Sequence, residues 1–511
     1  MPLSEWWRSA AFYQIYVRSF QDSNGDGVGD LPGIRSRLPY LKELGVDALW
    51  LTPFYPSPQA DHGYDVADYI DVDRLFGTLE DFDALVTDAH ELGIKVTIDI
   101  VPNHTSDQHE WFRNAIADPT HPHRAYYFFR PGRAGGRPNG WTSAFGGPAW
   151  TLDEATGEYY LHFFSPEQPD LDWHNEDVQA EFEHILRFWL DRGVDGFRID
   201  VAHALFKAQD LREMVEPVPK PHFGDWLSAL MQPELHPLYR RWRRLADEYD
   251  GDRMYVGEIV IESQDKIASY VGPDQLHLSF NFAFLYAPWD EEHMRKTIDK
   301  TLAALGAVGA PATWVFENHD VTRVPTRYGG GEVGQRRARA AALLLFGLTG
   351  TSFTYQGQEL GLEEVDLPDE ARQDPVFLHT NGARKGRDGC RVPIPWTDEP
   401  PAFGFTDGEP WLPMPQNWGA VSVAAQQEEP ESMLALYRSA IRLRPRGEGF
   451  AWRESPVGTM IFDRGDLTCV VNFDADELEL PDGQLVLASE PGITTTLPPN
   501  TAAWIKRGAA Q

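Results

Sequence analysis

The sequence predicts an α/β protein: a closed parallel (β/α)8 barrel with an inserted subdomain after strand 3 and a C-terminal β-sandwich domain. Three observations lead to this fold. Short apolar stretches alternate with segments of helical periodicity over most of the 511 residues. A stretch rich in Gly, Pro, His and aromatic residues, too long for an ordinary loop, follows the third apolar stretch. The last residues then change to short strands separated by Gly and Pro turns.

The strands of the barrel are predicted from eight short stretches that are rich in apolar, β-branched and aromatic residues. They are residues 11–20, 47–53, 95–101, 194–201, 253–260, 277–282, 313–320 and 351–359. Between them, residues 78–93 and 175–193 repeat apolar side chains every three or four positions, which is typical of helices that pack on a sheet.

The domain organisation follows from this alternation. We expect the first part of the barrel at residues 1–103, the inserted subdomain over the barrel mouth at 104–173, and the second part of the barrel at 174–445. The second part ends with a helix at 431–444. Residues 446–511 are predicted to form the C-terminal β-sandwich domain.

The composition is that of a globular protein, with 42% hydrophobic and 24% charged residues. The net charge of −33 argues against nucleic acid or an anionic membrane as a partner, because both are bound by clustered Lys and Arg. The acidic residues are spread along the chain and indicate solvated faces. The charge indicates nothing sharper about a partner, and the oligomeric state is left open.

The cysteines and the apolar runs indicate the cellular compartment of the protein. Cys390 and Cys469 cannot form a disulfide framework and are expected to be reduced, although a single bridge between them stays open. The first residues carry Glu and Arg where a secretory signal needs an apolar run. The longest apolar run, 341–348, is too short to cross a bilayer. These features predict a cytoplasmic protein without a membrane segment.

A candidate metal site follows the first strand, in the stretch DSNGDGVGD at residues 22–30. Its oxygen-bearing groups recur at every second position and resemble the first part of a calcium loop, with a structural Ca2+ or Mg2+ expected. The predicted ligands are Asp22, Asn24, Asp26, the carbonyl of Val28, and Asp30. Gly33 stands where an EF-hand has its bidentate Glu, so a metal-free turn rich in Asp and Gly is the alternative.

The candidate catalytic residues lie at the ends of three predicted strands. In the stretch 194–201, Arg198 and Asp200 alternate with apolar residues and so share one face of the strand. Arg198 can orient Asp200 and keep it ionised, as a nucleophile needs, although a buried structural ion pair is an equal alternative from this stretch alone. Glu258 and Asp320 place further carboxylates at other strand ends, which favours a catalytic role for Asp200 over a structural ion pair.

The chemistry that this set suits is retaining glycoside hydrolysis, which needs two carboxyl groups about 5 Å apart. Asp200 would attack the sugar carbon. Glu258 stands among Val256, Ile259 and Val260, so its pKa should be raised for the acid/base role. No organic cofactor is implied, because acid/base and covalent carboxylate chemistry need none.

The stretches DIVPNH, QPDLDW, GFRIDVAHALFK, GEI and ENHD, in this order, resemble the conserved regions of the α-amylase superfamily, glycoside hydrolase family 13. The resemblance covers nearly the whole chain. It implies Asp200 as nucleophile, Glu258 as acid/base and Asp320 as the carboxylate that holds two sugar hydroxyls. It also implies that His104, Arg198 and His319 belong to the same glucose site.

Within that family, the chain is most similar to the α-glucosidase and oligo-1,6-glucosidase branch. The stretch DHGYD at 61–65 implies that Asp61 caps the non-reducing end of the sugar and that Tyr64 stacks on its ring. The stretch RDGCRVP at 387–393 implies Arg391 as the partner of Asp61. Such a cap implies a closed pocket and exo-action on short substrates. Phe145 either lines this pocket or packs in the core.

The resemblance leaves the linkage open. Val201 is of the type found in α-1,6-acting members, whereas Ala202-His203, Asp172 and the stretch PIPW depart from the oligo-1,6-glucosidase pattern. The expected activity is that of a retaining exo-α-glucosidase on short α-glucosides, maltose-type preferred and α-1,6 possible, with transglucosylation. The alternatives are a glucosyltransferase or a sucrose-isomerising enzyme. A non-catalytic barrel subunit is disfavoured, because such relatives lose the carboxylates and carry a membrane anchor.

Overall fold

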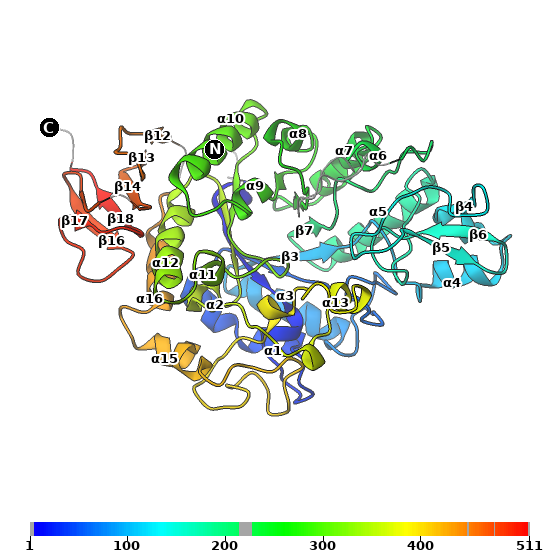
Figure 1. The fold of residues 1–511 in the computed structure, drawn as a ribbon, viewed down its shortest axis with the longest axis horizontal. Coiled ribbons are helices and arrows are strands. Elements are labelled where there is room, and N and C mark those ends of the chain that lie inside the picture. The colour runs from blue at the N-terminus through cyan, green and yellow to red at the C-terminus, as the bar shows by residue number, and fades with distance from the viewer. Residues whose placement is uncertain (1–4, 214–226, 447–448, 475, 509–511) are drawn as a thin grey trace.

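A computed structural model describes residues 5–213, 227–446, 449–474 and 476–508. Eight parallel strands form its centre (Figure 1), hydrogen-bonded in the order β10-β11-β1-β2-β3-β7-β8-β9. They are β1 (Ala11–Ile15), β2 (Ala48–Leu51), β3 (Lys95–Ile100), β7 (Gly196–Ile199), β8 (Met254–Gly257), β9 (Leu278–Ser279), β10 (Thr313–Val315) and β11 (Thr351–Tyr355). Each predicted barrel strand is present, and the fold is the expected (β/α)8 barrel.

The barrel is nearly closed. In the described residues, the short strands β9 and β10 at its two edges share no backbone ladder. The hydroxyl of Thr313 on β10 donates a hydrogen bond to the carbonyl of Ser279 on β9 and bridges the two edges. A side chain thus takes the place of the missing backbone bonds.

The first strand is shorter than predicted. Residues 11–20 were expected to be one strand, but β1 ends at Ile15 and Val17–Ser19 form a 3-10 turn. The backbone N–H groups of Tyr16 and Val17 donate to the side chains of Gln356 and Thr52, at 2.8 and 3.1 Å. Because side chains satisfy these donors, the chain can leave the sheet here without burying unpaired N–H groups.

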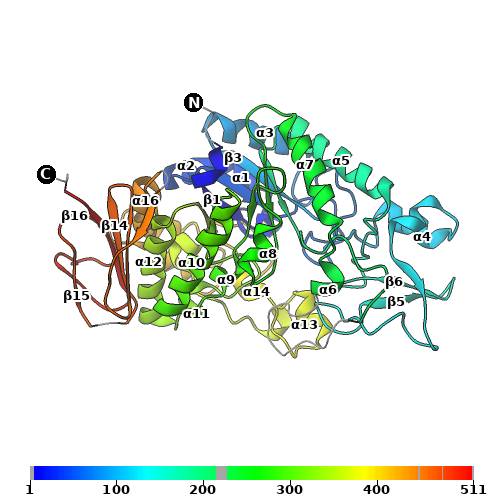
Figure 2. The same ribbon diagram turned by 90° about the horizontal axis from the view of Figure 1, so that it is seen from above.

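The strands pack on both faces, which explains their near-continuous hydrophobicity. Inside the barrel, Phe12, Trp50, Val256 and Phe353 belong to one apolar cluster. Outside, the strands pack against helices that surround the barrel (Figure 2). The main ones are α3 (Leu79–Glu91), α5 (Glu176–Asp191), α7 (Leu235–Asp247), α10 (Glu291–Ala307) and α12 (Gly331–Gly347).

Polar caps fix where the two predicted helices begin. The Thr78 hydroxyl accepts from the Asp81 N–H, and the Asp81 carboxylate accepts from the Thr78 N–H, which forms a capping box at the start of α3. The side chain of Asn175 accepts from the Asp177 N–H, at 2.9 Å, and starts α5 in the same way.

The segment between β3 and α5 forms a separate body at the side of the barrel (Figure 1). It holds α4 (Glu110–Ala117) and an antiparallel sheet of β4 (Phe129–Pro131), β6 (Glu158–Leu161) and β5 (Trp150–Asp153). The buried Lys207, in the loop after β7, joins it to the barrel. Its Nζ lies 2.9 Å from Asp170 Oδ2 and donates to Asn103 Oδ1 at 2.7 Å.

The C-terminal region has two antiparallel sheets, in agreement with the predicted β-sandwich. Five strands pair in the order β12 (Phe450–Trp452), β13 (Thr459–Arg464), β14 (Leu467–Asn472), β18 (Thr501–Lys506) and β16 (Gln484–Ala488). The strands β15 (Leu478–Glu479) and β17 (Thr496–Leu497) form the second sheet. The larger sheet contacts α12, which in turn contacts α16 (Met433–Leu443), the predicted last helix of the barrel.

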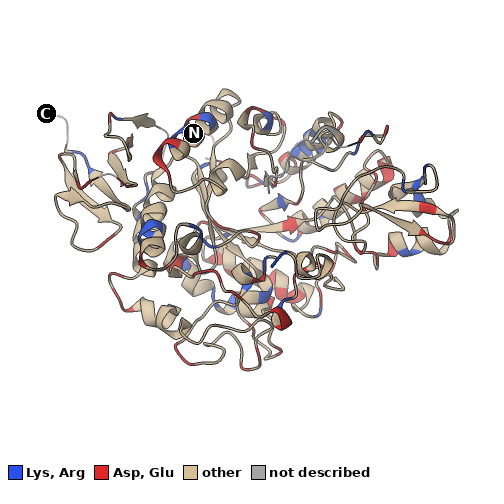
Figure 3. Cartoon of the chain, viewed as in Figure 1, with Lys and Arg blue, Asp and Glu red and all other residues tan. Residues whose placement is uncertain are grey.

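The charged residues are distributed over all parts of the fold, as expected from their spread along the chain (Figure 3). Cys390 and Cys469 are both buried and unpaired. Within the described ranges, none of the helices has the length and apolar character needed to span a bilayer.

Candidate active site

A cavity of about 560 Å3 opens where the barrel strands end. Eight of the residues singled out in the sequence line it: Asp61, Tyr64, His104, Phe145, Asp200, Glu258, His319 and Asp320. Arg198 and Arg391 are buried and bind carboxylates of this set from behind. Phe145 and Phe164 reach the cavity from the inserted segment, so this segment forms part of the wall.

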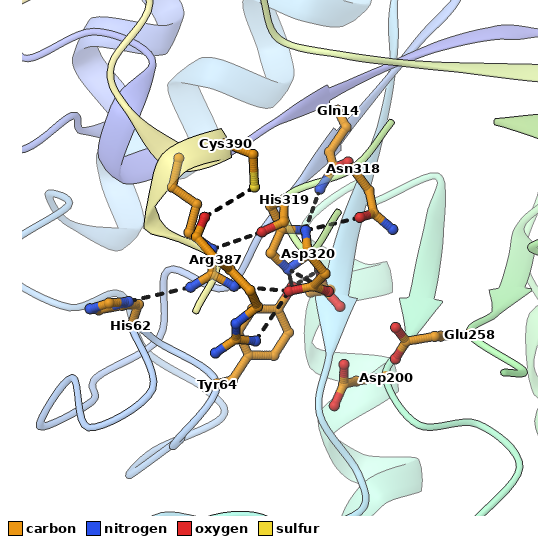
Figure 4. Close-up of polar contacts among 12 residues, drawn as sticks. Gln14, His62, Tyr64, Asp200, Glu258, Asn318, His319, Asp320, Arg387 and Cys390 are labelled. Atoms are coloured by element: carbon orange, nitrogen blue, oxygen red, sulfur yellow. Dashed lines mark hydrogen bonds and ion pairs between the residues drawn. The ribbon is translucent and has the colours of Figure 1, made fainter. Parts of the chain in front are cut away.

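Strand register brings Asp200 and Glu258 together. The N–H of Asp200 donates to the carbonyl of Ile100, and the N–H of Glu258 donates to the carbonyl of Ile199, each at 2.9 Å. Both carboxylates therefore follow directly on neighbouring strands. Figure 4 shows their carboxyl groups side by side, with Asp320 on the other side of the site.

The residue after Asp200 has a strained backbone. Val201 has φ = 45°, in the left-handed region that β-branched residues rarely adopt. In this conformation its N–H donates to Glu258 Oε2 at 3.0 Å. The strain thus serves to hold one oxygen of Glu258 next to Asp200.

Arg198 binds three carboxylates at once. Its Nη1 donates to Asp99 Oδ1 at 2.7 Å and to Asp200 Oδ1 at 2.6 Å, and its Nη2 lies 2.8 Å from Glu258 Oε1. Asp99 is the residue opposite Arg198 in the β3–β7 pairing, and it also accepts from Trp50 Nε1 at 2.8 Å. The sequence indicated the Arg198–Asp200 pair, but not that Asp99 and Glu258 share the same guanidinium.

This sharing changes the expected protonation of Asp200. Burial raises the pKa of the Asp200 carboxyl well above its ordinary value, and Arg198 opposes the rise while Glu258 and Asp99 add to it. Burial also raises the pKa of Asp99 to about 6. The direction of this pKa shift is opposite to the one expected from the Arg198–Asp200 pair, because one positive charge is divided among three carboxyl groups. The pKa of Asp200 therefore depends on burial and on its two carboxyl neighbours as well as on Arg198.

Asp320 is in the opposite electrostatic setting. Burial raises its pKa, but the guanidinium groups of Arg387 and Arg391 outweigh this effect and lower the pKa well below its ordinary value. Arg387 Nη1 and Arg391 Nη2 donate to Asp320 Oδ1 at 3.1 and 2.9 Å. Asp320 is therefore an ionised acceptor at the cavity wall.

Asp61 is bound by a different arginine from the one expected. Arg387 Nη2 donates to Asp61 Oδ1 at 2.8 Å, and Arg387 Nε donates to Asp374 Oδ2 at 2.6 Å. Arg391 lies behind the site, where its Nε donates to the carbonyl of His319 at 2.8 Å. The predicted Arg391–Asp61 pair was wrong. Arg387 precedes the short helix α14 (Asp388–Arg391) and faces the cavity, whereas Arg391 ends it and is fully buried.

Two neutral histidines support the sugar-facing groups. His319 is stacked between Tyr16 and Tyr64, with ring centroids 5.6 and 5.4 Å away, and its Nε2 lies 2.8 Å from the Tyr64 hydroxyl. Burial lowers the pKa of His319 well below its ordinary value and that of His104 to about 4. Both rings can therefore hydrogen-bond to hydroxyls without carrying charge.

Gln168 is a site residue that the sequence reasoning did not single out. Its Nε2 donates to Asp61 Oδ2 at 3.2 Å and lies 3.1 Å from His104 Nε2, so it joins two predicted groups. It stands at the head of the quoted stretch QPDLDW. The motif QPDLDW was the signal in the sequence that could have identified Gln168.

The predicted metal loop is held by its own hydrogen bonds. Asp22 Oδ1 accepts from the N–H of Asn24 and Gly25, and the oxygens of Asn24, Asp26 and Asp30 likewise accept backbone N–H groups. Carboxylate, amide and carbonyl oxygens are donors that suit a hard cation. However, no three His, Cys, Asp or Glu side chains gather as metal ligands in the part of the chain that the structure describes. The hydrogen bonds of the loop fix its conformation, and the metal site stays a prediction.

The comparisons with known proteins agree with this geometry. Residues 14–451 match the family model "Alpha amylase, catalytic domain". The chain belongs to the α-amylase family, glycoside hydrolase family 13. Residues 443–504 match a domain of unknown function, DUF3459. Among curated relatives, an oligo-1,6-glucosidase of Heyndrickxia coagulans is 39% identical over 86% of this chain and 85% of its own length. A probable alpha-glucosidase of Rhizobium meliloti is 40% identical over 88% and 84%.

Solved structures of this glycoside hydrolase family superpose on nearly the whole chain. The alpha-glucosyl transfer enzyme XgtA gives a TM-score of 0.89 at 39% identity and covers 98% of this chain and 99% of its own. The trehalulose synthase MutB from Pseudomonas mesoacidophila MX-45 gives 0.89 at 32% identity, with 99% and 100% covered. The family member described here therefore shares its architecture with an alpha-glucosyl transfer enzyme and a trehalulose synthase.

Replacing Arg387 by Ala is expected to raise KM for a short α-glucoside by about tenfold to a hundredfold. A hydrogen bond to a charged group contributes about 1.5–3 kcal/mol, and this change frees Asp61 from its only arginine contact in the described structure. Steady-state kinetics on maltose and isomaltose measure the effect. Arg384→Ala, at an exposed residue of the same cavity wall, is the control. Equal changes in the two variants would contradict the assignment of Arg387 to Asp61.

Proposed function

We propose that this family 13 member is a retaining exo-acting α-glucosidase that releases glucose from the non-reducing end of short α-glucosides. The observation that carries the proposal is the wall formed by Asp61, Arg387 and Asp320 beside the Asp200–Glu258 pair. One guanidinium ties the two acids together, so this side of the cavity has a fixed end. A fixed end behind one sugar favours terminal glucose over internal positions of a long chain.

The site residues then take the following roles. Asp200, as the carboxylate, attacks the anomeric carbon while Glu258, as the acid, gives a proton to the departing oxygen. A covalent glucosyl-Asp200 intermediate results. Glu258 next takes a proton from water, which attacks the same carbon and releases glucose with retained configuration. Asp320 is ionised and suited to accept hydrogen bonds from two sugar hydroxyls, and Tyr64 offers its ring for stacking.

Maltose-type substrates and α-1,6-linked ones both belong to the proposal. Val201 next to Asp200 and the relatives named oligo-1,6-glucosidase support α-1,6 cleavage. Incubation with maltose, isomaltose, sucrose and soluble starch, with the anomer of released glucose followed, tests it. Release of α-glucose from disaccharides is the expected result. Internal cleavage of starch, or β-glucose as first product, would contradict the closed pocket or the retaining mechanism.

Transfer of glucose to a second sugar is proposed as a side reaction. The structural similarity to an alpha-glucosyl transfer enzyme and a trehalulose synthase supports a second candidate function, in which a sugar rather than water accepts the glucosyl group. The ratio of transfer product to free glucose at high substrate concentration separates the two functions.

A cytoplasmic location is proposed as well, because two buried unpaired thiols suit a reducing compartment.

A structural Ca2+ (or Mg2+) at Asp22, Asn24, Asp26, Val28 and Asp30 stays part of the proposal. Millimolar Ca2+ is then expected to raise the Tm of chelator-treated protein, since a ligand at 100 times its Kd stabilises by about 2.7 kcal/mol. Differential scanning calorimetry measures this, and Asp26→Ala should abolish the shift. An unchanged Tm in Ca2+ and in Mg2+ would support the metal-free turn. The loop supplies no group to the catalytic cavity, so kcat should stay unaltered.

A further inference from the structure

A second cavity, of about 420 Å3, adjoins the glucose pocket. The two share the side chains of Val260, Phe282 and Tyr286. The rest of the second cavity is formed by α8 (Gln264–Ala268), its preceding loop, Ala283 of α9 (Phe282–Leu285), and α10, and α8 and α10 lie next to each other in the fold (Figure 2). A molecule that extends out of the glucose pocket past these three residues enters this space.

The position of the second cavity relative to Glu258 identifies which part of a substrate would reach it. Asp61 and Arg387 occupy the end of the glucose pocket proposed for the non-reducing side. Glu258 protonates the oxygen of the leaving group, and Val260, two residues further on, lines both cavities. Tyr286 is 36% exposed, and its ring centroid lies 6.1 Å from that of Phe282. These rings lie where the leaving group would pass.

One wall of the second cavity is basic. His293, Lys296 and Lys300 line it from α10 and share one face of that helix, because they are three and four positions apart. Like charges at spacing i,i+4, as in Lys296 and Lys300, destabilise a helix. Glu262 is the acidic member of the lining. The cavity wall therefore has an excess of positive charge.

Of the three acidic residues of α10, two have other partners, and Glu292, four positions before Lys296, forms no ion pair in the described structure. Glu291 lies 3.9 Å from Arg295, and Asp299 accepts from Trp452 Nε1 at 2.6 Å. Among the residues that the structure describes, neither Lys296 nor Lys300 forms an ion pair. A neutral sugar does not require two ammonium groups. In a chain with a net charge of −33, which repels anions at long range, an anionic group needs such a local site.

We propose that the second cavity binds a phosphate or carboxylate group on the leaving part of the substrate, so that anionic α-glucosides are preferred. Lys296 and Lys300 supply the charge, and Tyr286 packs against the sugar that carries the anion. The inference rests on the proposed exo-glucosidase function and specifies its substrate class. Lys296 and Lys300 act in binding, and bond cleavage remains with Asp200 and Glu258.

The test compares kcat/KM for three matched substrates: maltose, maltobionate with a carboxylate at the reducing end, and maltose with a 6-phosphate on the reducing-end glucose. The wild type is expected to prefer at least one anionic substrate. The double variant Lys296→Gln/Lys300→Gln should lower kcat/KM for that substrate by about tenfold through KM, and for maltose by less than about twofold. The anionic substrate whose kcat/KM falls in the double variant shows whether the cavity binds phosphate or carboxylate.

Lys266→Gln is the matched control, because Lys266 is an exposed lysine of the neighbouring helix α8 that does not line the cavity. It should leave all three values unchanged. Raising the salt concentration from about 0.05 to about 0.5 M should weaken only the anionic substrates. Equal losses for neutral and anionic substrates in the double variant, or a wild-type preference for maltose over both anions, would overturn the inference. Failure of the proposed function itself would show separately, as no cleavage of maltose or isomaltose.

Discussion

Replacing Asp200 by Asn is expected to lower kcat for α-glucoside hydrolysis by about 10⁴-fold or more, the scale seen when a catalytic nucleophile is removed. An amide cannot form the glucosyl ester, and it cannot exchange a proton with Glu258. The fold should persist, because burial and the nearby carboxyl groups already raise the pKa of Asp200 and make its charged form costly. Initial rates on maltose and isomaltose, together with thermal unfolding, measure both effects.

The control for this variant is Asp210→Asn, an exposed Asp in the loop after β7 that lies outside the cavity. Its rate and Tm should match those of the wild type. Mass spectrometry of rapidly denatured enzyme should detect a glucosyl adduct on the wild type and none on Asp200→Asn. Full activity in Asp200→Asn would disprove the mechanism.

Replacing Arg198 by Met is expected to lower the free energy of unfolding by about 3–5 kcal/mol at pH 7, because removing one partner of a buried ion pair leaves uncompensated charge. Here one guanidinium serves Asp99, Asp200 and Glu258. Activity should be lost as well, since Asp200 and Glu258 lose a shared anchor. Urea unfolding monitored by tryptophan fluorescence measures the change.

The pH dependence gives a further check on Arg198→Met. A carboxyl group whose folded-state pKa is raised favours the folded state at low pH, and that stability is lost as pH rises through the folded pKa. Burial places the pKa of Asp99 at about 6 even with Arg198 present. Between pH 5 and 8, the free energy of unfolding should therefore fall more for the variant than for the wild type. The difference should appear at pH values near and above about 6, the pKa of Asp99 with Arg198 present.

The matched control is Arg192→Met, which removes a partly exposed arginine paired with Asp83 at 2.6 Å. Surface pairs of this kind contribute about 0–1 kcal/mol, so a small, nearly pH-independent change is expected. A loss of similar size in both variants would show that Arg198 does not neutralise the buried carboxyl groups.

Local sequence patterns were sufficient to predict most of the fold. Apolar alternation and helical spacing marked the eight strands and the helices α3 and α5, and the structure places Thr78 and Asn175, the first residues of the predicted ranges, as the caps of these helices. The stretch 11–20 was the clearest failure. Its residues favour a strand throughout, but Gln356 and Thr52, distant in sequence, satisfy the backbone after Ile15 and let the chain turn. Local propensity carries no information about such partners.

The residues of the site, like the strands, were predictable from local sequence patterns. Each of them closes a strand or stands in a recognisable stretch. How they connect was not predictable. Arg387 and Arg391 are both arginines of one short motif, and the one that reaches Asp61 depends on where α14 begins relative to the cavity. Gln168 becomes part of the site only because the inserted segment folds back toward His104.

The sequence by itself determined the barrel, its two additions and the side chains that meet at its mouth, since periodicity and strand ends are properties of short stretches. Only the tertiary structure decided that Arg198 is shared by three acids, that Asp61 pairs with Arg387, and that a basic wall of α10 lies beside Tyr286. Electrostatic energies depend on distances between residues far apart in the chain, and those distances exist only after the strands are in register and the inserted segment is packed.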